Sequence, residues 1–560
     1  MLKFAVFDQS EPARTFAIEH GHLIGSEQLV IPGEITFEKG YLCVEKRTDG
    51  GAGSAGLGLL IAIEPFEGLG GGELVLRTCL LPQRNEPYLL TLELARQKVM
   101  TLYTKLEEWA FFDRFAEDPA LRLIERARAA FTAALLLARR TTGEPPYTAG
   151  ADAASRHALS VAVAAGEALS LAQASLQHGR RCTGEMAELA KVSVPSSALT
   201  DDEAHEARGA RVGSPGVILP DLPKVGCRVN PHTFTPGLCD ALIANFDFIS
   251  LPMRWVDMEP TEGKYGFAKF DRWIEWAVTK AKLPVHAGAV IDLHPRAVPD
   301  WLSIWEHDYE TLRDVVTEHV KNVVTRYRRT VAVWTVASSL NVGGTFKFTY
   351  EQSIDLTRAC VLMVKKLQPN AKVHVEIAQP FGEHGAQPRG GKSIPPVLYC
   401  ELMNQTQTPV DAFAVRVQAG QAECGRGARA LVSISCGLDR IAGAGKPLAV
   451  SVMGCPSRAA AGNEIEPEKG FAPGSFRSAG WTPETQAQWA AAVGAVIAGK
   501  TYVQSLCWQE IADAPMSASA EMPGGGILGA NGEAKPAVRA LGEIRKALRE
   551  KKGLPGTTGW

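Results

Sequence analysis

The stretch FDFISLPMRWVDMEPTEGKYGFAKFDRWIEW, residues 246–276, decides the fold of this chain. It opens on a short apolar run, FDFISLPM, and leads into FDRWIEWAVTKA, whose apolar residues recur at helical spacing. A buried strand followed by an amphipathic helix is the repeating unit of α/β folds. The stretch therefore predicts one β/α unit.

The same unit recurs between Lys224 and about Lys546. Helical patterns alternate there with eight apolar runs, which are VGCRV, FDFISLPM, LPVHAGAVI, AVWTVA, KVHVEIA, VDAFAVRV, PLAVSV and VQSLCW. Eight strand candidates with intervening helices predict a (β/α)8 barrel of the α/β class. We assign the barrel to residues 216–549 and a short tail to residues 550–560.

Two other patterns precede the barrel. Residues 1–95 hold short apolar segments separated by Gly and Pro, including GAGSAG and GLGGGE, and predict a β-rich module with a sandwich as a candidate arrangement. Residues 96–215 begin with alanine- and leucine-rich stretches whose apolar residues are spaced by three and four. They predict amphipathic helices, followed by a polar linker near residues 191–222.

Composition narrows the classes of partner. The 560 residues carry 59 basic and 61 acidic side chains without long runs of one sign, which argues against nucleic acid and against a polybasic membrane surface. The N-terminus lacks a secretory pattern, and the apolar stretch FTAALLLA at 131–138 ends at Arg139. We expect a cytoplasmic protein without a membrane partner.

The cysteines do not suggest a disulfide framework or a metal centre. Eleven are scattered singly without a CxxC pair, and the Gly-rich GLGGGE and GGGILG lack the context of phosphate loops. We expect free thiols, no metal and no cofactor.

The motif MRW at 253–255, with EPTEGKYGF at 259–267, resembles the second-strand region of glycoside hydrolase family 10, the xylanase-type barrels. Further agreement comes from PDWL at 299–302, HVKNVVTRYRRTVAVW at 319–334, QPNAKVHVE at 368–376 and NGEAKPAVRAL at 531–541. The resemblance covers residues 224–548. It implies a barrel with its ligand cleft at the C-terminal ends of the strands.

The chain departs from the family at the catalytic positions. The family retains configuration with two glutamates, one in W-D-V-V-N-E on the fourth strand and one in T-E-L-D on the seventh. Here WTVASS puts Ser339 at the acid/base position, and AVSVMGCPS puts Val452 at the nucleophile position. The resemblance thus implies a divergent member without the retaining glutamate pair, because neither residue can replace a carboxylate in that mechanism.

Other carboxylates stand where strands are predicted to end. The candidates for a relocated acid pair are Glu376, Glu383, Asp292 and Glu510. An inverting pair, with carboxyls roughly 6.5–9.5 Å apart, tolerates relocation best. The alternative for Glu376 is an ion pair with Arg254 or Arg416 inside the barrel mouth, and solvated loop charge is the alternative for Glu510.

The resemblance and the strand ends also suggest substrate-binding residues. They are Arg254, Trp255, His286, His294, His374, Arg416, Gln418 and Trp508. For the histidines the alternative is a satisfied core group, and for Trp508 it is a buried structural tryptophan.

Two hypotheses for function remain open. The first is a carbohydrate-active protein that hydrolyses or recognises a β-linked glycan, so that the partner is an oligosaccharide or polysaccharide. The second is a catalytically inactive pseudoenzyme that binds a glycan or a protein as a scaffold. In either case the helical segment is a candidate oligomer interface.

Overall fold

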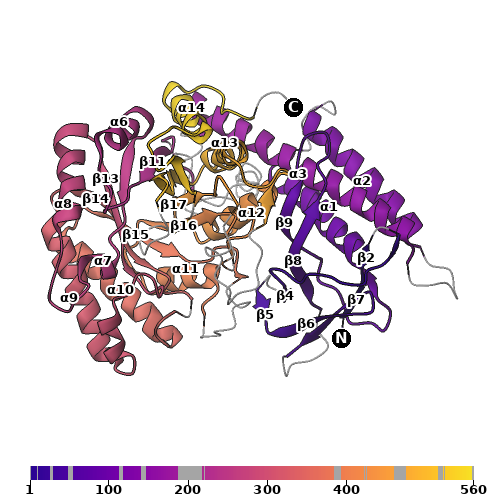
Figure 1. The fold of residues 1–560 in the computed structure, drawn as a ribbon, viewed down its shortest axis with the longest axis horizontal. Coiled ribbons are helices and arrows are strands. Elements are labelled where there is room, and N and C mark those ends of the chain that lie inside the picture. The colour runs from indigo at the N-terminus through magenta and orange to yellow at the C-terminus, as the bar shows by residue number, and fades with distance from the viewer. Residues whose placement is uncertain are drawn as a thin grey trace, which may run out of the picture.

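The chain forms a closed barrel joined to a β-rich and helical N-terminal part in the computed structural model (Figure 1). The structure describes all residues except 1, 9, 26–28, 48–53, 112–117, 140–146, 187–216, 220, 343, 384–392, 422, 424, 460–473, 515–520, 523 and 558–560. Most of the linker predicted near residues 191–222 lies outside the described residues.

Eight parallel strands close the barrel, each hydrogen-bonded to the next and the last to the first. They are β11 (Lys224–Arg228), β12 (Phe248–Leu251), β13 (Val285–Asp292), β14 (Val331–Ser338), β15 (Lys372–Ile377), β16 (Ala412–Gln418), β17 (Leu448–Gly454) and β19 (Val503–Trp508). They coincide with the eight apolar runs, so the predicted (β/α)8 barrel is confirmed. Among the described residues, no strand from the N-terminal part enters the barrel.

Helices occupy the connections, and their first turns carry the expected residues. Thr349 and Thr482 cap α10 and α13 through their hydroxyls, and prolines stand in the first turns of α6, α11, α13 and α14. The helices are α6 (Pro236–Asn245), α7 (Trp255–Met258), α8 (Ala268–Glu275), a π-helical turn (Trp276–Ala281), a 3-10 turn (Asp300–Trp305), α9 (Tyr309–Tyr327), α10 (Tyr350–Leu367), α11 (Pro396–Gln405), α12 (Leu431–Ala442), α13 (Pro483–Gly499) and α14 (Pro536–Glu550).

Two sheets form the β-rich N-terminal part, which confirms its predicted strand content. One has the order β10-β1-β7-β6 and the other β18-β9-β8-β4-β5. Their strands, with the small pair β2 and β3, are β1 (Leu2–Ala5), β2 (Phe7–Asp8), β3 (Glu11–Pro12), β4 (His22–Ile24), β5 (Val30–Ile31), β6 (Gly33–Glu38), β7 (Tyr41–Lys46), β8 (Gly56–Ile63), β9 (Gly72–Arg77), β10 (Tyr88–Leu89) and β18 (Ser475–Phe476). Apolar side chains of both sheets, such as Leu42 and Leu59, belong to one buried cluster.

Three helices follow these sheets, as the spacing of apolar residues predicts. They are α1 (Leu90–Glu108), α2 (Pro119–Leu137) and α3 (Ala149–Thr183). Helix α3 packs against α1, α2, α12 and α13. By length and composition alone α3 could cross a membrane, a feature not singled out from the sequence, but 83% of its apolar window is buried inside this protein.

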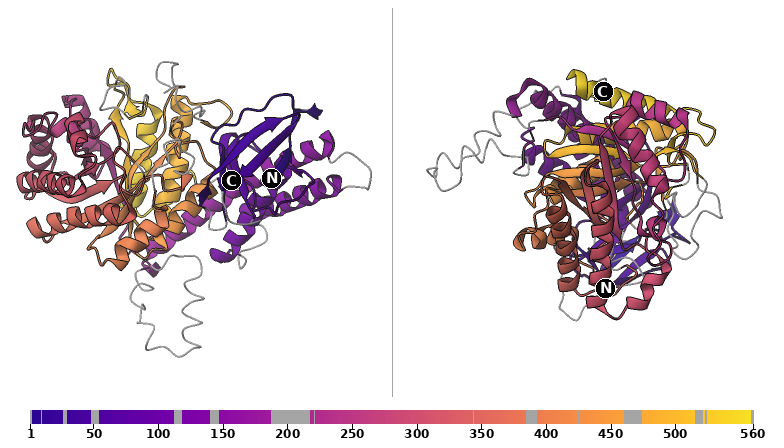
Figure 2. Two further views of the ribbon diagram at one scale, coloured as in Figure 1. Left: turned by 90° about the horizontal axis from the view of Figure 1, so that it is seen from below. Right: turned by 90° about the vertical axis from the view of Figure 1, so that its left-hand side faces the viewer.

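The barrel and the N-terminal part are physically joined. Strand β18, from the segment between β17 and α13, pairs antiparallel with β9 and so extends an N-terminal sheet. Beside it, Arg477 donates from Nη1 to Oε2 of the buried Glu167 on α3 over 2.9 Å. The views in Figure 2 place the N-terminal sheets and helices beside the barrel.

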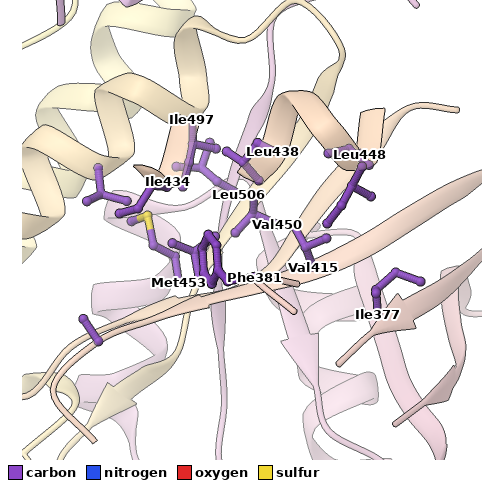
Figure 3. Close-up of a cluster of buried hydrophobic side chains, with 14 of the residues drawn as sticks. Ile377, Phe381, Val415, Ile434, Leu438, Leu448, Val450, Met453, Ile497 and Leu506 are labelled. Carbon is purple, nitrogen blue, oxygen red and sulfur yellow. The ribbon is translucent and has the colours of Figure 1, made fainter. Parts of the chain in front are cut away.

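Apolar packing holds the wall of the barrel to its helices. Figure 3 shows Val450 and Leu506 of the strands facing Ile434 and Leu438 of α12 and Ile497 of α13. Each of these side chains is at most 2% exposed. Burying one such side chain contributes roughly 1.5–3 kcal/mol, so the wall is a firm support for residues at the strand ends.

Candidate functional site

A buried carboxylate lies at the C-terminal end of β15. Glu376, 3% exposed, accepts hydrogen bonds from Oγ of Ser338 at 2.6 Å, from Nε of Arg416 at 2.7 Å and from Oγ of Ser451. These partners come from β14, β16 and β17, three strands of the same barrel. Because parallel strands end at the same rim, their last side chains converge on one mouth.

The network continues across the mouth through a second carboxylate. Nη1 of Arg416 donates to Oε2 of Glu521 at 2.7 Å, and Nη2 of Arg228 donates to Oε1 of the same residue at 2.8 Å. Arg228 is the last residue of β11, whereas Glu521 follows β19 in the chain. Glu376, Arg416, Glu521 and Arg228 thus form a continuous chain of alternating charge, which we call the mouth network.

The mouth network keeps its carboxylates ionised. Burial raises the pKa of Glu376, but Arg416 and the hydroxyls of Ser338 and Ser451 outweigh burial and hold it below its ordinary value. Burial also opposes ionisation of Glu521, and Arg228 and Arg416 outweigh it, so its pKa lies well below the ordinary value. Neither group carries a proton at neutral pH.

Glu510 has the opposite environment. It begins the short strand β20 (Glu510–Ala512), which closely follows β19 in the chain. Strand β20 pairs with β21 (Gly526–Leu528). Burial raises its pKa to about 8, and the charge of Arg228 only partly offsets this. Among the described residues, its Oε2 atom has no hydrogen-bond partner. Glu510 is therefore a protonated carboxyl next to the ionised mouth network.

Asp292 and His294 lie on the same rim. Asp292 ends β13, opposite Ser338 in the sheet register, and its Oδ1 accepts the backbone N–H of His294 at 3.0 Å. Its charge also acts on Arg416. Nε2 of His294 lies 4.0 Å from Oε1 of Glu423, and burial lowers the pKa of His294.

Arg254 and Trp255 follow β12 but are occupied by neighbours. Arg254 donates from Nε to Oδ2 of Asp257 at 2.8 Å, not to Glu376. The indole of Trp255 is 1% exposed, stacks on His319 at 4.2 Å and donates to Glu259 at 2.8 Å. Arg254 therefore forms an ion pair with Asp257, whereas Glu376 was the expected partner. Trp255 is too buried to stack on a ligand in this structure.

His286 and His374 lie deeper in the barrel than the mouth network. They are the second and third residues of their strands, and parallel strands start at the end away from the mouth. His286 stacks on Phe248 at 3.9 Å, and His374 contacts Gln504 at 2.8 Å. Burial lowers the pKa of His286 to about 3 and that of His374 to about 4, so both are neutral.

Glu383 is separate from the mouth network. Its carboxylate lies 2.6 Å from Nη2 of Arg429, 3.3 Å from Nη2 of Arg77 and 4.0 Å from Nε2 of His22. Two of these partners, Arg77 and His22, belong to the N-terminal sheet. The structure therefore places Glu383 where the N-terminal part meets the barrel, and does not bring it to Glu376.

Gln418 and Trp508 end β16 and β19, but both are buried. Nε2 of Gln418 donates to Oε1 of Gln509 at 2.7 Å. Trp508 is 1% exposed and donates to the carbonyl of Gly525 at 3.0 Å. Trp508 is therefore a buried structural tryptophan and does not present a ring face for a sugar.

Ser339 and Val452, the residues at the two implied catalytic positions, flank this mouth. Ser339 directly follows β14 and has a left-handed φ of 62°. Its Oγ lies 3.3 Å from Oγ of Ser338. Val452 is 3% exposed and stands opposite Arg416 in the register of β17 and β16.

Sequence reasoning missed Arg228, Ser338, Ser451 and Glu521. Arg228 could have been found, because a charged residue ending a predicted barrel strand faces the mouth rim. Glu521 follows no periodic pattern and gives no such signal. The serines are unremarkable in sequence, and only the strand register brings them to Glu376.

Residues 239–344 match the protein-family model described as Glycosyl hydrolase family 10. This confirms the resemblance to family 10 for the part of the barrel from α6 to the segment after β14. Among curated proteins, Endo-1,4-beta-xylanase B of Thermotoga neapolitana is 30% identical over 96 residues, which are 17% of this chain and 27% of that protein. Endo-1,4-beta-xylanase of Agaricus bisporus is 22% identical over 168 residues, which are 29% of this chain and 48% of that protein. The matches thus span about a quarter and about half of these relatives.

Two solved structures are similar at low identity. Native xylanase10C from Cellvibrio japonicus aligns with a TM-score of 0.45 and 14% identity, over 62% of this chain and 75% of that one. Native xylanase 10B from Thermotoga maritima aligns with a TM-score of 0.44 and 17% identity, over 59% of this chain and 95% of that one.

Proposed function

We propose that the barrel mouth recognises a β-linked oligosaccharide and does not hydrolyse it by the retaining mechanism. The observation that carries this proposal is the mouth network, in which Glu376 and Glu521 are both held by arginines. A retaining pair needs one carboxyl that gives up a proton and a second, free carboxylate that attacks the sugar. Glu376 has no proton to give, and its oxygens are already occupied by three donors.

The same groups are suited to binding hydroxyls. The side chain of Arg416 is 14% exposed and that of Glu521 is 17% exposed, so the middle of the network is in contact with solvent. Hydrogen bonds to ionised groups are stronger than those between neutral groups, and sugar hydroxyls both donate and accept. The names of the curated relatives direct the choice of ligand to β-1,4-linked xylo-oligosaccharides.

Calorimetric titration with xylotetraose tests the binding. We expect wild-type protein to bind it and Arg416→Lys to bind it roughly 10-fold more weakly, because lysine keeps the charge but loses the planar fork of donors. The exposed Arg539→Lys on α14 is the matched control and should bind as wild type does. Failure of wild-type protein to bind any xylo-oligosaccharide would overturn the proposal.

Mass spectrometry after incubation with a mechanism-based fluorosugar tests the absence of retaining chemistry. We expect no glycosyl adduct, because no carboxylate stands at Val452 to form the ester. An adduct on any residue of β17 would contradict the proposal.

A second candidate function is hydrolysis with Glu510 as the proton donor. The specific observation in its favour is the contrast between the raised pKa of Glu510, about 8, and the lowered pKa values of Glu376 and Glu521. Such a contrast is how enzymes separate an acid from a base. If xylotetraose is hydrolysed, Glu510→Gln should reduce turnover by roughly two to four orders of magnitude, and the exposed control Glu543→Gln should not. Equal turnover in wild type and Glu510→Gln would exclude this role.

A further inference from the structure

A cavity of about 550 Å³ lies between the N-terminal part and the barrel. Helix α1 and strand β9 form one side, and helix α12 with the segment after β15 forms the other. Met100 and Thr104 are exposed at its rim, whereas Lys98 and Arg429 are each 4% exposed. The cavity therefore has an entrance from solvent and a buried floor, and its volume is in the range of small-molecule sites.

Cationic side chains gather at the floor. Arg77 donates from Nη2 to the carbonyl of Phe381 at 2.9 Å and lies 3.3 Å from Glu383. Arg429 lies 2.6 Å from the same carboxylate, and its guanidinium stands 4.2 Å over the ring of Phe381. Lys98 donates from Nζ to Oγ of Ser433 at 3.0 Å.

Cations outnumber carboxylates around this cavity. Its lining carries five cationic side chains, Arg77, Lys98, Lys105, Arg429 and Arg440, and two carboxylates, Glu108 and Asp439. With Glu383 at the floor as a third carboxylate, an excess of two positive charges remains. Among the described residues, no carboxylate lies within ion-pair distance of Lys98, and Nε of Arg429 has no hydrogen-bond partner.

The excess charge is energetically costly at the buried floor of the cavity. Burial, together with the charges of Arg77 and Arg429, lowers the pKa of Lys98 to about 8. Burial likewise lowers the pKa of Arg77 to about 10, where Glu383 opposes the effect and Arg429 and Arg440 add to it. Buried like charges repel one another unless an anion balances them.

We propose that this cavity is a binding site for a phosphate-bearing small molecule. A phosphate ester carries close to two negative charges at neutral pH, which balances the excess of two, whereas a carboxylate balances only one. Guanidinium groups match phosphate oxygens with paired donors. The cavity is larger than one phosphate group, and Gln97, Thr101 and Ser433 line it with polar groups suited to a hydroxylated remainder. The site is distinct from the barrel mouth.

Thermal unfolding and calorimetry with inorganic phosphate and glucose 6-phosphate test the proposal, with glucose and acetate as reference ligands. We expect both phosphates to raise the Tm of the full-length protein, glucose 6-phosphate more than inorganic phosphate, and glucose and acetate to have no effect. Lys98→Met should weaken phosphate binding roughly 10- to 100-fold, the scale of one hydrogen bond to a charged group.

The control variant is Lys280→Met, which removes the same charge from an exposed position on the barrel. It should bind glucose 6-phosphate as wild type does. Lys98→Met should also fold with an unchanged or higher Tm without ligand, because it relieves repulsion at the floor. Equal phosphate effects in Lys98→Met and wild type, or an equal response to acetate and phosphate, would overturn the proposal. Tighter binding of inorganic phosphate than of glucose 6-phosphate would contradict the proposal that the ligand is a phosphate ester.

Discussion

Two buried glutamates of the barrel part, Glu376 and Glu510, differ in protonation because of their neighbours. Glu376 accepts three hydrogen bonds and pairs with Arg416, whereas Glu510 is buried with an oxygen that has no hydrogen-bond partner among the described residues. Desolvation disfavours the ionised form of both side chains, so the partners decide the outcome. One carboxyl is ionised at neutral pH and the other is protonated.

The stability of the protein should fall as the pH rises through neutrality because of Glu510. Burial raises its pKa from 4.5 to about 8, so between these pH values the folded protein keeps a proton that the unfolded chain has released. We expect the free energy of unfolding to drop by about 2–4 kcal/mol from pH 5 to pH 8 through this group. Glu510→Gln should flatten that dependence in urea titrations. An unchanged pH slope in the variant would contradict the raised pKa.

Removing the charge of Glu376 should destabilise the fold. Glu376→Gln leaves Arg416 with Glu521 alone, and breaking a buried ion pair costs about 3–5 kcal/mol. The folded-state pKa is lowered, so this contribution is present at neutral pH and is lost as the pH falls below about 4.5. We expect the wild type and the variant to differ in urea unfolding at pH 7, and the difference to shrink progressively as the pH falls below 4.5. Equal stability of wild type and variant at pH 7 would show that Glu376 does not stabilise the fold.

The sequence predicts the Glu376 and Arg416 half of the mouth network but not the Glu521 and Arg228 half. The pairing of Glu376 with Arg416 was among the alternatives, because both residues stand near the ends of predicted strands. Glu521 lies outside any periodic segment, and the buried Trp508 contacts Gly525 and Trp489, which belong to other elements or loops. Contacts of this kind follow from the closed barrel rather than from local pattern.

Among the elements, helix α3 and helix α13 are in close backbone contact at a glycine. A Cβ on Gly499 would lie 2.5 Å from Cα of Ala174 and 2.8 Å from its carbonyl oxygen. We expect Gly499→Ala to lower the free energy of unfolding by about 1–3 kcal/mol, because backbone atoms must move apart. Thermal and urea unfolding measure this.

Gly179→Ala on α3 is the matched control for that substitution. Nothing lies within 4 Å of a Cβ at Gly179, and alanine favours a helix over glycine by about 1 kcal/mol. The control should leave stability unchanged or raise it. A loss of stability in both variants would show that the close approach of the helices is not the cause.

The elements themselves were largely predictable because each follows a local periodicity. The eight barrel strands are short, mainly apolar runs, and the three N-terminal helices repeat apolar residues every three or four positions. Strand β18 was not predictable, because it has two residues and exists only where β9 offers an edge. Short strands made by tertiary pairing leave no periodic signal.

At the scale of the whole molecule, the barrel and the N-terminal part share one interior. A single apolar cluster includes Leu59 of β8, Leu171 of α3 and Val496 of α13. Polar links cross the same boundary, because Arg181 of α3 donates to the carbonyl of Lys500 at 3.0 Å and Arg477 binds Glu167. These contacts are buried, unlike those of domains tethered by a linker.

We therefore expect the two parts to unfold together. Differential scanning calorimetry of the full chain should give one transition, and Glu167→Gln should lower its Tm without splitting it, because Arg477 then lacks a charged partner at a buried site. The exposed Glu543→Gln, which loses only a surface pair with Arg539, is the control and should leave the Tm nearly unchanged. Two separate transitions in the wild type would mean that the shared apolar cluster does not couple unfolding of the barrel to unfolding of the N-terminal part. The cavity between them would then be lost when the less stable part unfolds.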